Sequence, residues 1–462
     1  MASGSRKRSA NGEYIFIDGK ALRADEVVSI DMRSTMAPGQ EAVSTVPGAK
    51  EAADGTKDGK TSKLSGALRN LGKDDALELS PEVLEGSLGI ENTRSLLADE
   101  RKKMRAKYLT FGAVLVLLAL ASLCMSSQHP GRFYAPTEVI AGLATWVQLG
   151  VTFVVDNANF ATERLRAVQA NPDLSDHLLQ VQVVFKYLAC GALLALSGML
   201  YQNAFKNPIA APSMLGVTSG INIALLVLVM QFGYEAFTHV NLYYVYSIIG
   251  GVLVLALVML GGKWISGKGG FNAVNMILMG TIVSQLLGVV IQYVQTNFMD
   301  EVQWDAYNLL MNATGVVGPW MYGTLVIGGL AALIPVIVFR FRLNLISFSD
   351  AETKLLGVDP TRLRLLALAC GSVMILVAQL NSGQVAMISL IVPFLVRAVF
   401  GAEFRKQLGG NLLMGALVLL ICGDLSTTIV FDGYAVGLAP VVSIVALPLF
   451  VWMMALRQRS WE

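Results

Sequence analysis

Asp424 is the carboxylate whose surroundings most suggest chemistry, because it lies in the apolar run ICGDLSTT. Placing a charged side chain in lipid is costly, so a carboxylate within a membrane span is by default a functional candidate. The other interpretation is that Asp424 hydrogen-bonds to neighbouring helices and fixes their packing. We expect this packing role.

The histidines and cysteines do not suggest a metal site. The histidines occur singly, and the cysteines fall in apolar segments without CxxC or Cys/His spacing, so neither a zinc site nor a disulfide framework is indicated. These residues are His129, His177, His239, Cys124, Cys190, Cys370 and Cys422. We therefore expect this chain to bind no metal and no cofactor.

The segment GTKDGKT, from Gly55 to Thr61, resembles a phosphate-binding loop. Only three residues separate Gly55 from Gly59, whereas the motif requires four, and no apolar strand precedes it. We expect no nucleotide site in this chain and no enzymatic activity of its own. A net charge of +2 also argues against a nucleic-acid binder.

The composition is that of an integral membrane protein. Hydrophobic residues make up 54% of the chain and charged residues 15%, and the apolar residues gather in runs near the roughly 20 residues that span a bilayer. We expect an all-α fold of about ten transmembrane helices. The expected spans lie near residues 108–125, 182–201, 214–232, 242–262, 273–297, 319–339, 363–380, 384–400, 409–430 and 436–456.

A basic cluster before the first span sets the expected orientation. Positive charge beside a first span keeps that side in the cytoplasm. We expect residues 1–107 to form a cytoplasmic, partly disordered extension and residues 108–462 to form the transmembrane domain. Both termini of this multi-pass protein of the cell membrane are then cytoplasmic. The cluster is Arg101, Lys102, Lys103, Arg105 and Lys107.

Charges in the later connections test this orientation. Connections expected inside carry Lys and Arg, whereas those expected outside after residue 200 carry Asp and Glu, which is the asymmetry of the positive-inside rule. The basic residues include Lys206, Lys263, Arg340, Arg364 and Arg405, and the acidic ones Glu235, Asp300, Asp305 and Asp432. Counting Val139 to Val155 as a span would reverse every later connection, so we assign it to a helix on or near the outer surface.

Residues 191–226 predict a closely packed pair of membrane helices. Gly191, Ala195 and Gly198 line one apolar segment and Gly216 and Gly220 the next. Small residues at this spacing let helix backbones approach closely in lipid. Prolines in the polar break between the segments predict an irregular turn, tolerated where protein or water satisfies its backbone groups.

The run GALLALSGMLYQNAFKNPIAAPSMLGVTSG resembles the signature of FecCD-type permeases, which import iron-siderophore, haem and cobalamin complexes in ATP-binding-cassette (ABC) systems. The resemblance continues through LNLISFSDAETKLLGV, SGQVAMISLIVPFLVRAVFG and GALVLLICGDLSTT, and it covers most of the chain after residue 108. It implies packing or translocation roles for the residues at the motif positions. These are Gly198, Gln202, Asn207, Pro208, Pro212, Gly216, Gly220, Pro393, Arg397 and Asp424.

The chain departs from the family pattern at three places, and one of them is the arginine that commonly follows the motif aspartate, since Asp424 is followed by LSTT. Phe394 stands where the family's IVPHxxR run has His, and we expect the nearby Arg397 to extend to the inner membrane face. By spacing, Gln180 and Val183 replace the two arginines of a common RxPR motif. In the family this outer surface receives the substrate-binding protein through complementary charge, so here another basic group takes over or the partner docks differently.

The segment SFSDAETKLLGVDP begins with a capping signal and ends at Gly357 and Pro360. It therefore predicts a short helix near Asp350 to Leu356. The resemblance makes this the coupling helix that sits in a cleft of the ATP-hydrolysing subunit; the alternative is a tight cytoplasmic loop. The coupling residues would be Asp350, Ala351, Leu355, Leu356 and Gly357.

The resemblance implies a permease subunit that works by alternating access. Its expected partners are a second permease subunit, identical or related, two ABC ATPase subunits that use the ATP, an extracytoplasmic substrate-binding protein, and membrane lipid. One alternative is an ion-coupled secondary transporter that uses Asp424. Another is a membrane-bound sensor whose N-terminal region is the working domain. Copurification with an ATPase would separate these alternatives.

Overall fold

The computed structural model describes residues 14–17, 20–23, 90–126, 132–155, 166, 174–237, 239–267, 273–312, 318–401, 403–431 and 434–459. The Gly55 to Thr61 motif and His129 lie outside these residues. The contacts between residues divide the chain into two compact units, Met1–Glu91 and Asn92–Glu462. Within the first unit, Tyr14–Ile17 (β1) pairs antiparallel with Lys20–Arg23 (β2). Strand β1 lies within the segment EYIFIDG.

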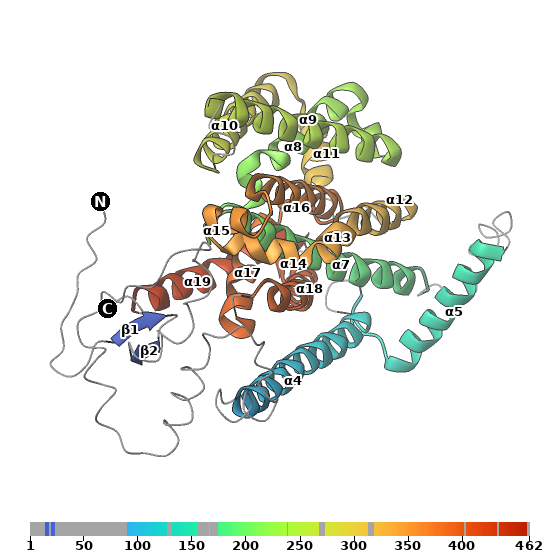
Figure 1. Cartoon of the computed structure of the whole chain (residues 1–462). Helices are drawn as coiled ribbons and strands as arrows, with labels where there is room; N and C mark the ends of the chain where they lie inside the picture. The colour runs from blue at the N-terminus through green and yellow to red at the C-terminus, as the bar shows by residue number, and fades with distance from the viewer. Residues whose placement is uncertain are drawn as a thin grey trace, which may run out of the picture. The chain divides into compact units, whose positions relative to one another are not determined.

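The second unit is a bundle of long helices arranged around α7, Leu174–Ala204 (Figure 1). Helices α16, α17 and α18 pack directly against α7, and α8, α9, α10 and α11 form a second group beside them. The bounds of these helices are α8 Val217–Phe232, α9 Val240–Ser266, α10 Ala273–Phe298, α11 Glu301–Asn312, α16 Pro360–Ser382, α17 Ala386–Phe400 and α18 Phe404–Thr428.

The remaining elements flank these helices or connect them. One continuous span runs through α12, a π-helical turn η4, and α13. A two-stranded hairpin precedes α19, and α4 and α5 come before α7. Their bounds are α4 Ile90–Leu123, α5 Pro136–Val155, η1 Pro212–Leu215, η2 Gly233–Phe237, α12 Pro319–Gly323, η4 Thr324–Gly328, α13 Gly329–Val338, α14 Arg340–Leu343, η5 Asn344–Ser347, α15 Asp350–Leu355, β3 Val430–Phe431, β4 Tyr434–Ala435 and α19 Leu438–Arg459.

Small residues bring α7 against its neighbours, as the spacing predicts. A Cβ at Gly191 would lie 2.2 Å from the carbonyl oxygen of Gly415 on α18, and one at Gly198 would lie 1.6 Å from that of Ser389 on α17. The same close approach joins α8 to α9, where a Cβ at Gly220 would lie 2.4 Å from the carbonyl oxygen of Gly250. Backbones therefore touch at the centre of the bundle, which is how helices gain packing energy in lipid.

The number of spans agrees with the sequence. Among the described residues, 8 helices are long and apolar enough to cross a membrane, and two shorter apolar helices, Met387–Phe400 and Leu438–Val451, supply the other two expected spans. The fold is that of an all-α membrane protein. Helix α4 continues without a break from Ile90 into the first span, so the expected boundary at residue 107 falls inside a helix.

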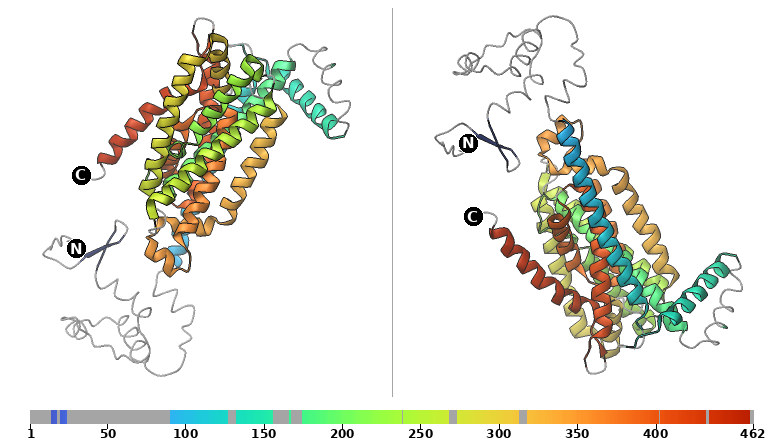
Figure 2. Two further views of the ribbon diagram at one scale, coloured as in Figure 1. Left: turned by 90° about the horizontal axis from the view of Figure 1, so that it is seen from above. Right: turned by 90° about the horizontal axis from the view of Figure 1, so that it is seen from below.

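Basic and acidic connections gather at opposite ends of the bundle, as the alternating spans require. At one end Lys206 contacts Asp350, and Lys107 Nζ donates to the carbonyl oxygen of Val399 at 2.6 Å. At the other end, Tyr134 and Ser126 hydroxyls donate to the carboxylate of Asp176. Helix α5 begins at this acidic end and projects away from the bundle in both views of Figure 2. It was predicted to lie on or near the outer surface.

We expect Gly198→Ala to destabilise the protein, because the added methyl group would overlap the carbonyl oxygen of Ser389 and force α7 and α17 apart. Overpacking of this kind costs roughly 1–3 kcal/mol. The matched control is Gly112→Ala on α4, where nothing lies within 4 Å of the new Cβ. Thermal unfolding of both purified variants in detergent measures the difference. Equal midpoints for the two variants would show that this contact does not hold the bundle together.

Candidate functional site

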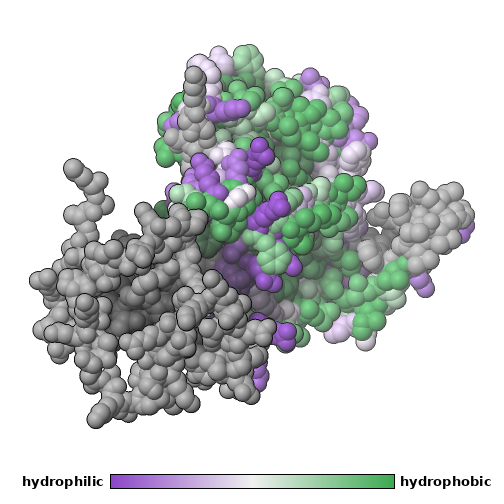
Figure 3. Space-filling view, viewed as in Figure 1, coloured by the Kyte–Doolittle hydropathy of each residue, from purple (hydrophilic) through white to green (hydrophobic). Residues whose placement is uncertain are grey.

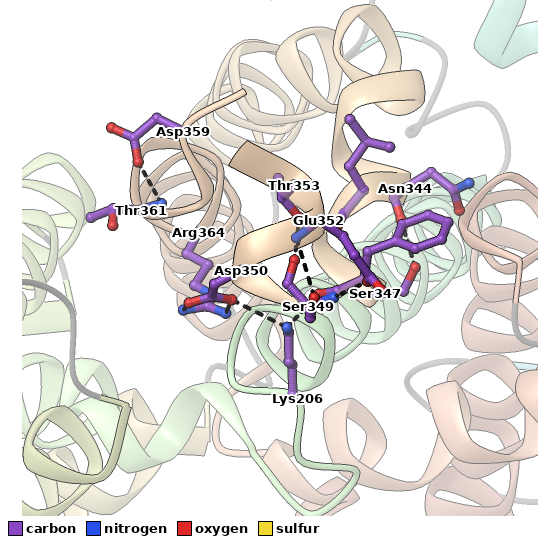
Figure 4. Close-up of polar contacts among 12 residues, drawn as sticks. Lys206, Asn344, Ser347, Ser349, Asp350, Glu352, Thr353, Asp359, Thr361 and Arg364 are labelled. Atoms are coloured by element: carbon purple, nitrogen blue, oxygen red, sulfur yellow. Dashed lines mark hydrogen bonds and ion pairs between the residues drawn. The ribbon is translucent and has the colours of Figure 1, made fainter. Parts of the chain in front are cut away.

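The predicted short helix is present as α15, Asp350–Leu355, at the basic end of the bundle (Figure 4). The Ser349 hydroxyl accepts a hydrogen bond from the Glu352 backbone N–H at 3.2 Å, and the Glu352 carboxylate accepts one from the Ser349 N–H at 2.8 Å. This reciprocal capping box satisfies two backbone donors at the start of the helix. Gly357 ends the turn in a left-handed conformation, with φ of 76°.

Asp350 joins α15 to two membrane spans. Its carboxylate forms a two-pronged ion pair with the guanidinium of Arg364 on α16, and it accepts a hydrogen bond at 3.3 Å from Lys206 Nζ, which follows α7. Partial burial by itself raises the pKa of Asp350, but Arg364 and Lys206 outweigh it and lower this pKa below its usual value. The carboxylate is therefore ionised throughout the physiological range.

The two faces of α15 differ in exposure. The Thr353 side chain is buried, and its hydroxyl donates to the carbonyl oxygens of Leu345 and Ser349 at 3.1 and 2.9 Å. On the other side Leu355 is 87% exposed and Leu356 59% exposed. Because the polar contacts anchor one face, the two leucines form an exposed apolar edge on the other face of the helix.

A recess of about 630 Å³ opens beside the exposed leucines. Leu356 and Gly357 form one wall, and Arg342, Arg362 and Leu366 contribute to the others. Apolar residues dominate the described surface in Figure 3, and hydrophilic ones interrupt it where Figure 1 draws α14 and α15. A protruding apolar edge beside a basic recess is a surface suited to a protein partner.

The signature residues at the basic end of α7 form a network rather than a ligand cavity. Gln202 Nε2 donates to the carbonyl oxygen of Leu390 at 2.9 Å, and Arg397 donates to Asn203 Oδ1 at 3.2 Å. Asn203 also reaches Gln407 on α18. The position of Arg397 near the inner membrane face stays a prediction, and its half-buried guanidinium, in the last turn of α17, ties α17 to α7.

The turn after α7 is built by the remaining motif residues. Asn207 accepts a hydrogen bond from the Ile209 N–H with its side chain and one from the Ala210 N–H with its carbonyl oxygen. Pro208 lies half-buried in this turn, and Pro212 is buried at the start of η1. Gly216 follows with φ of 76°, the left-handed conformation that favours glycine. These residues thus shape the backbone between α7 and α8.

Asp424 lies near the acidic end of α18 and accepts a hydrogen bond from the Ser122 hydroxyl of α4 at 2.7 Å. The Ser122 carbonyl oxygen in turn accepts one from Gln180 Nε2 at 2.7 Å. Asp424 therefore joins α4 to α18, and Gln180 joins α7 to the same serine. The geometry agrees with the packing role expected for Asp424, and Gln180 fills a structural role at a position where the family motif has arginine.

Lys186 was not recognised from the sequence. It is 2% exposed within α7, and its Nζ lies 5.6 Å from the centroid of the Tyr187 ring. Within the described part of the chain it has no carboxylate partner, although a buried lysine in a span is costly and by default a functional candidate. Its signal was visible as the one charge in the run VQVVFKYLACG.

Comparison with known proteins assigns this architecture. A sequence model of the FecCD transport family matches residues 143–456. The chain belongs to the FecCD transport family. It is thus a membrane permease, and this family membership accounts for the signature turn, the capped helix α15 and the all-α bundle. Along the described residues the signature turn comes before α15, which is the order that the resemblance implies.

Two relatives illustrate the similarity. A probable iron chelatin transport system permease protein of Helicobacter pylori is 29% identical over 296 residues, 61% of this chain and 83% of the relative. The hemin transport system permease protein of Yersinia pestis is 30% identical over 276 residues, 58% of this chain and 79% of the relative. Both matches include most of the relative, so the shared part is the permease body.

One solved structure has the same fold. A metal-chelate type ABC transporter in an inward-facing conformation superposes with a TM-score of 0.60 at 21% identity, and the match covers 76% of this chain and 99% of that chain. Nearly all of the fold of that chain is therefore present here. The remaining part of this chain has no counterpart in it.

We expect Asp350→Ala to loosen α15 while leaving the bundle folded, because the substitution removes its ion pairs to Arg364 and Lys206. A half-exposed pair contributes about 1 kcal/mol or less. A nitroxide label at Leu355 should become more mobile by electron paramagnetic resonance. The control is Asp99→Ala, which breaks the exposed Asp99 to Lys103 pair on α4. Unchanged label mobility would exclude the anchoring role of Asp350.

Lowering the pH should also loosen α15 in the wild-type protein, because protonation of Asp350 weakens the same ion pairs to Arg364 and Lys206. Because the folded pKa of Asp350 is lowered, its contribution is complete above the ordinary aspartate value of about 4 and is lost as the pH falls through the folded pKa. The label at Leu355 should therefore stay immobile from pH 7 down to about pH 4 and gain mobility below that pH. In Asp350→Ala this acid transition should become smaller, and the remaining part belongs to Glu352, whose pKa is also lowered by its capping bonds to Ser349.

Proposed function

We propose that this chain is the permease subunit of an ABC importer that carries an iron chelate, haem or a related metal complex across the cell membrane into the cytoplasm. The observation that carries this proposal is α15, a rigidly capped helix whose polar side is fixed to two spans and whose leucines face outward. The names of its relatives, which include iron chelatin and hemin permeases, support the class of substrate.

The basic end of the bundle is proposed as the cytoplasmic end. It contains α15 and the positive charges that stay inside during insertion. Both termini then lie in the cytoplasm. In this orientation the substrate-binding protein approaches the acidic end and the ATPase the basic end. This arrangement suits an ABC import system in the inner membrane of a cell.

ATP hydrolysis is proposed to occur on two separate ATPase subunits, with no cofactor held by this chain. Each ATPase would receive α15 of one permease, and a second permease subunit would complete the pathway. Movement of the ATPase would act on α15, and the Asp350 contacts would pass that movement to the ends of α7 and α16. Alternating access then requires that the two end states differ in affinity for the substrate.

The ion-coupled alternative has less support from the geometry. It requires a carboxylate that takes part in transport, whereas Asp424 accepts a hydrogen bond from Ser122 and links two helices. A gradient-driven carrier also gives no role to the outward leucines of α15. Uptake that depends on an ion gradient, persists without ATPase subunits and is lost in Asp424→Asn would favour that alternative.

The substrate is tested in proteoliposomes that contain the permease, its copurified ATPase subunits and a partner binding protein. ATP-dependent accumulation of haem or of a ferric chelate is the expected result. The two substrates, together with a corrinoid, are offered separately so that one class is identified. Failure of all three with intact ATP hydrolysis would contradict the proposed substrate class.

We expect Leu356→Asp to uncouple hydrolysis from transport or to weaken ATPase binding, because a charged carboxylate would replace an apolar side chain and lose its water against the partner. Such burial costs several kcal/mol by rough estimate. Membrane abundance should stay normal, since Leu356 lies outside the spans. The matched control is Leu356→Met, which keeps an apolar side chain of similar size. Normal transport by Leu356→Asp with its ATPase bound would exclude α15 as the coupling surface.

A further inference from the structure

A second recess at the basic end of the bundle has a different chemistry from the one beside α15. It encloses about 680 Å³ between α4, α14 and the start of α18. Five basic side chains and two carboxylates line it, so positive charge is in excess. The basic residues are Arg101, Arg105, Arg340, Arg405 and Lys406.

Most of this positive charge is not neutralised by the protein. Lys406 forms an ion pair with Glu403 at 3.1 Å. The guanidinium carbons of Arg340 and Arg405 instead lie 5.1 and 5.0 Å from the centroid of the Phe341 ring, so an aromatic face supports them and leaves their N–H donors available. Among the described residues, no carboxylate forms an ion pair with these two arginines or with the two of α4.

The recess lies where the apolar part of α4 begins. Tyr108 lines it, donates its hydroxyl hydrogen to the Lys406 carbonyl oxygen at 2.6 Å, and stacks on Phe400 with ring centroids 4.9 Å apart. One residue further on, Leu109 is 73% exposed, and Leu117 two turns later is 66% exposed. The cationic recess therefore continues directly into an apolar surface that faces the membrane.

Helix α4 is only lightly attached to the bundle along this surface. In the most apolar 18 residues of α4, 6% of the residues are buried, compared with 72% in the corresponding part of α7. Figure 2 shows α4 along the outside of the bundle. The contacts of Tyr108 and the Lys107 bond to Val399 hold its basic end, and Ser122 holds the other. Between these points large side chains rather than backbones separate α4 from its neighbours.

We propose that this recess binds the headgroup of an anionic phospholipid, whose acyl chains lie along the exposed face of α4. Arginine forks match the geometry of a phosphate diester, and basic recesses between helices at the cytoplasmic side are suited to anionic headgroups. The continuous apolar surface below the recess favours a lipid over a free phosphate, which would leave that surface unused. The bound lipid links α4 to α14 and α18 and stabilises the first span.

The test uses the full purified chain in detergent, with phosphatidylglycerol and phosphatidylcholine of identical acyl chains as probes. Native mass spectrometry should show phosphatidylglycerol retained in preference to phosphatidylcholine, and the thermal midpoint should rise with phosphatidylglycerol only. Combined Arg101→Gln, Arg105→Gln and Arg405→Gln substitutions should weaken phosphatidylglycerol binding by roughly tenfold or more. Replacing the same three residues by Lys should retain only part of the binding, because the charge is kept but the fork of donors is lost.

The control removes the same amount of charge outside the recess, through Lys102→Gln, Lys263→Gln and Arg362→Gln. It should bind phosphatidylglycerol as the wild type does. Equal loss in this control, or unchanged binding in the recess variant, would overturn the proposal. So would an equal rise of the thermal midpoint with inorganic phosphate. Loss of ATPase copurification with unchanged lipid binding would instead identify the recess as a protein contact and likewise overturn it.

Discussion

The close approach of glycine backbones around α7 is the constraint on which the rest of the structure depends. Gly191 and Gly198 bring α7 against α18 and α17 at distances that leave no room for a methyl group. Helix interfaces in lipid rely on such packing because the surrounding chains are as apolar as the side chains. With α7 fixed at the centre, the turn that follows it, the Asn203 network and the position of Lys206 beneath α15 are all determined.

Much of this arrangement could be predicted, because membrane spans and signature motifs leave strong marks in a sequence. The apolar runs predict the helices, the small residues predict the contacts of α7, and Ser349 with Glu352 predicts the capped helix α15. Side-chain partners could not be predicted in the same way. The hydrogen bond from Arg397 to Asn203 depends on three helices meeting, and the same residue type near a membrane face also suits an interfacial position.

Lys186 and the recess beside α4 could not be predicted from the sequence for a different reason. A single lysine in a long apolar run does not change the prediction of a span, although its burial is one of the more costly features of the bundle. The recess combines residues from α4, α14 and α18, which are far apart in the chain. Only the fold brings their charges together, so local composition indicated a basic flank and no binding site.

The carboxylate of Asp350 has a mechanical consequence. It holds α15 to the end of α16 through Arg364 and to the end of α7 through Lys206, so one small helix is fastened at a single point to two different spans. A force applied to the leucines cannot displace one of these spans and leave the other behind without breaking an ion pair. If α15 receives the ATPase as proposed, these ion pairs link the movements of two spans that are separated by more than a hundred residues of chain.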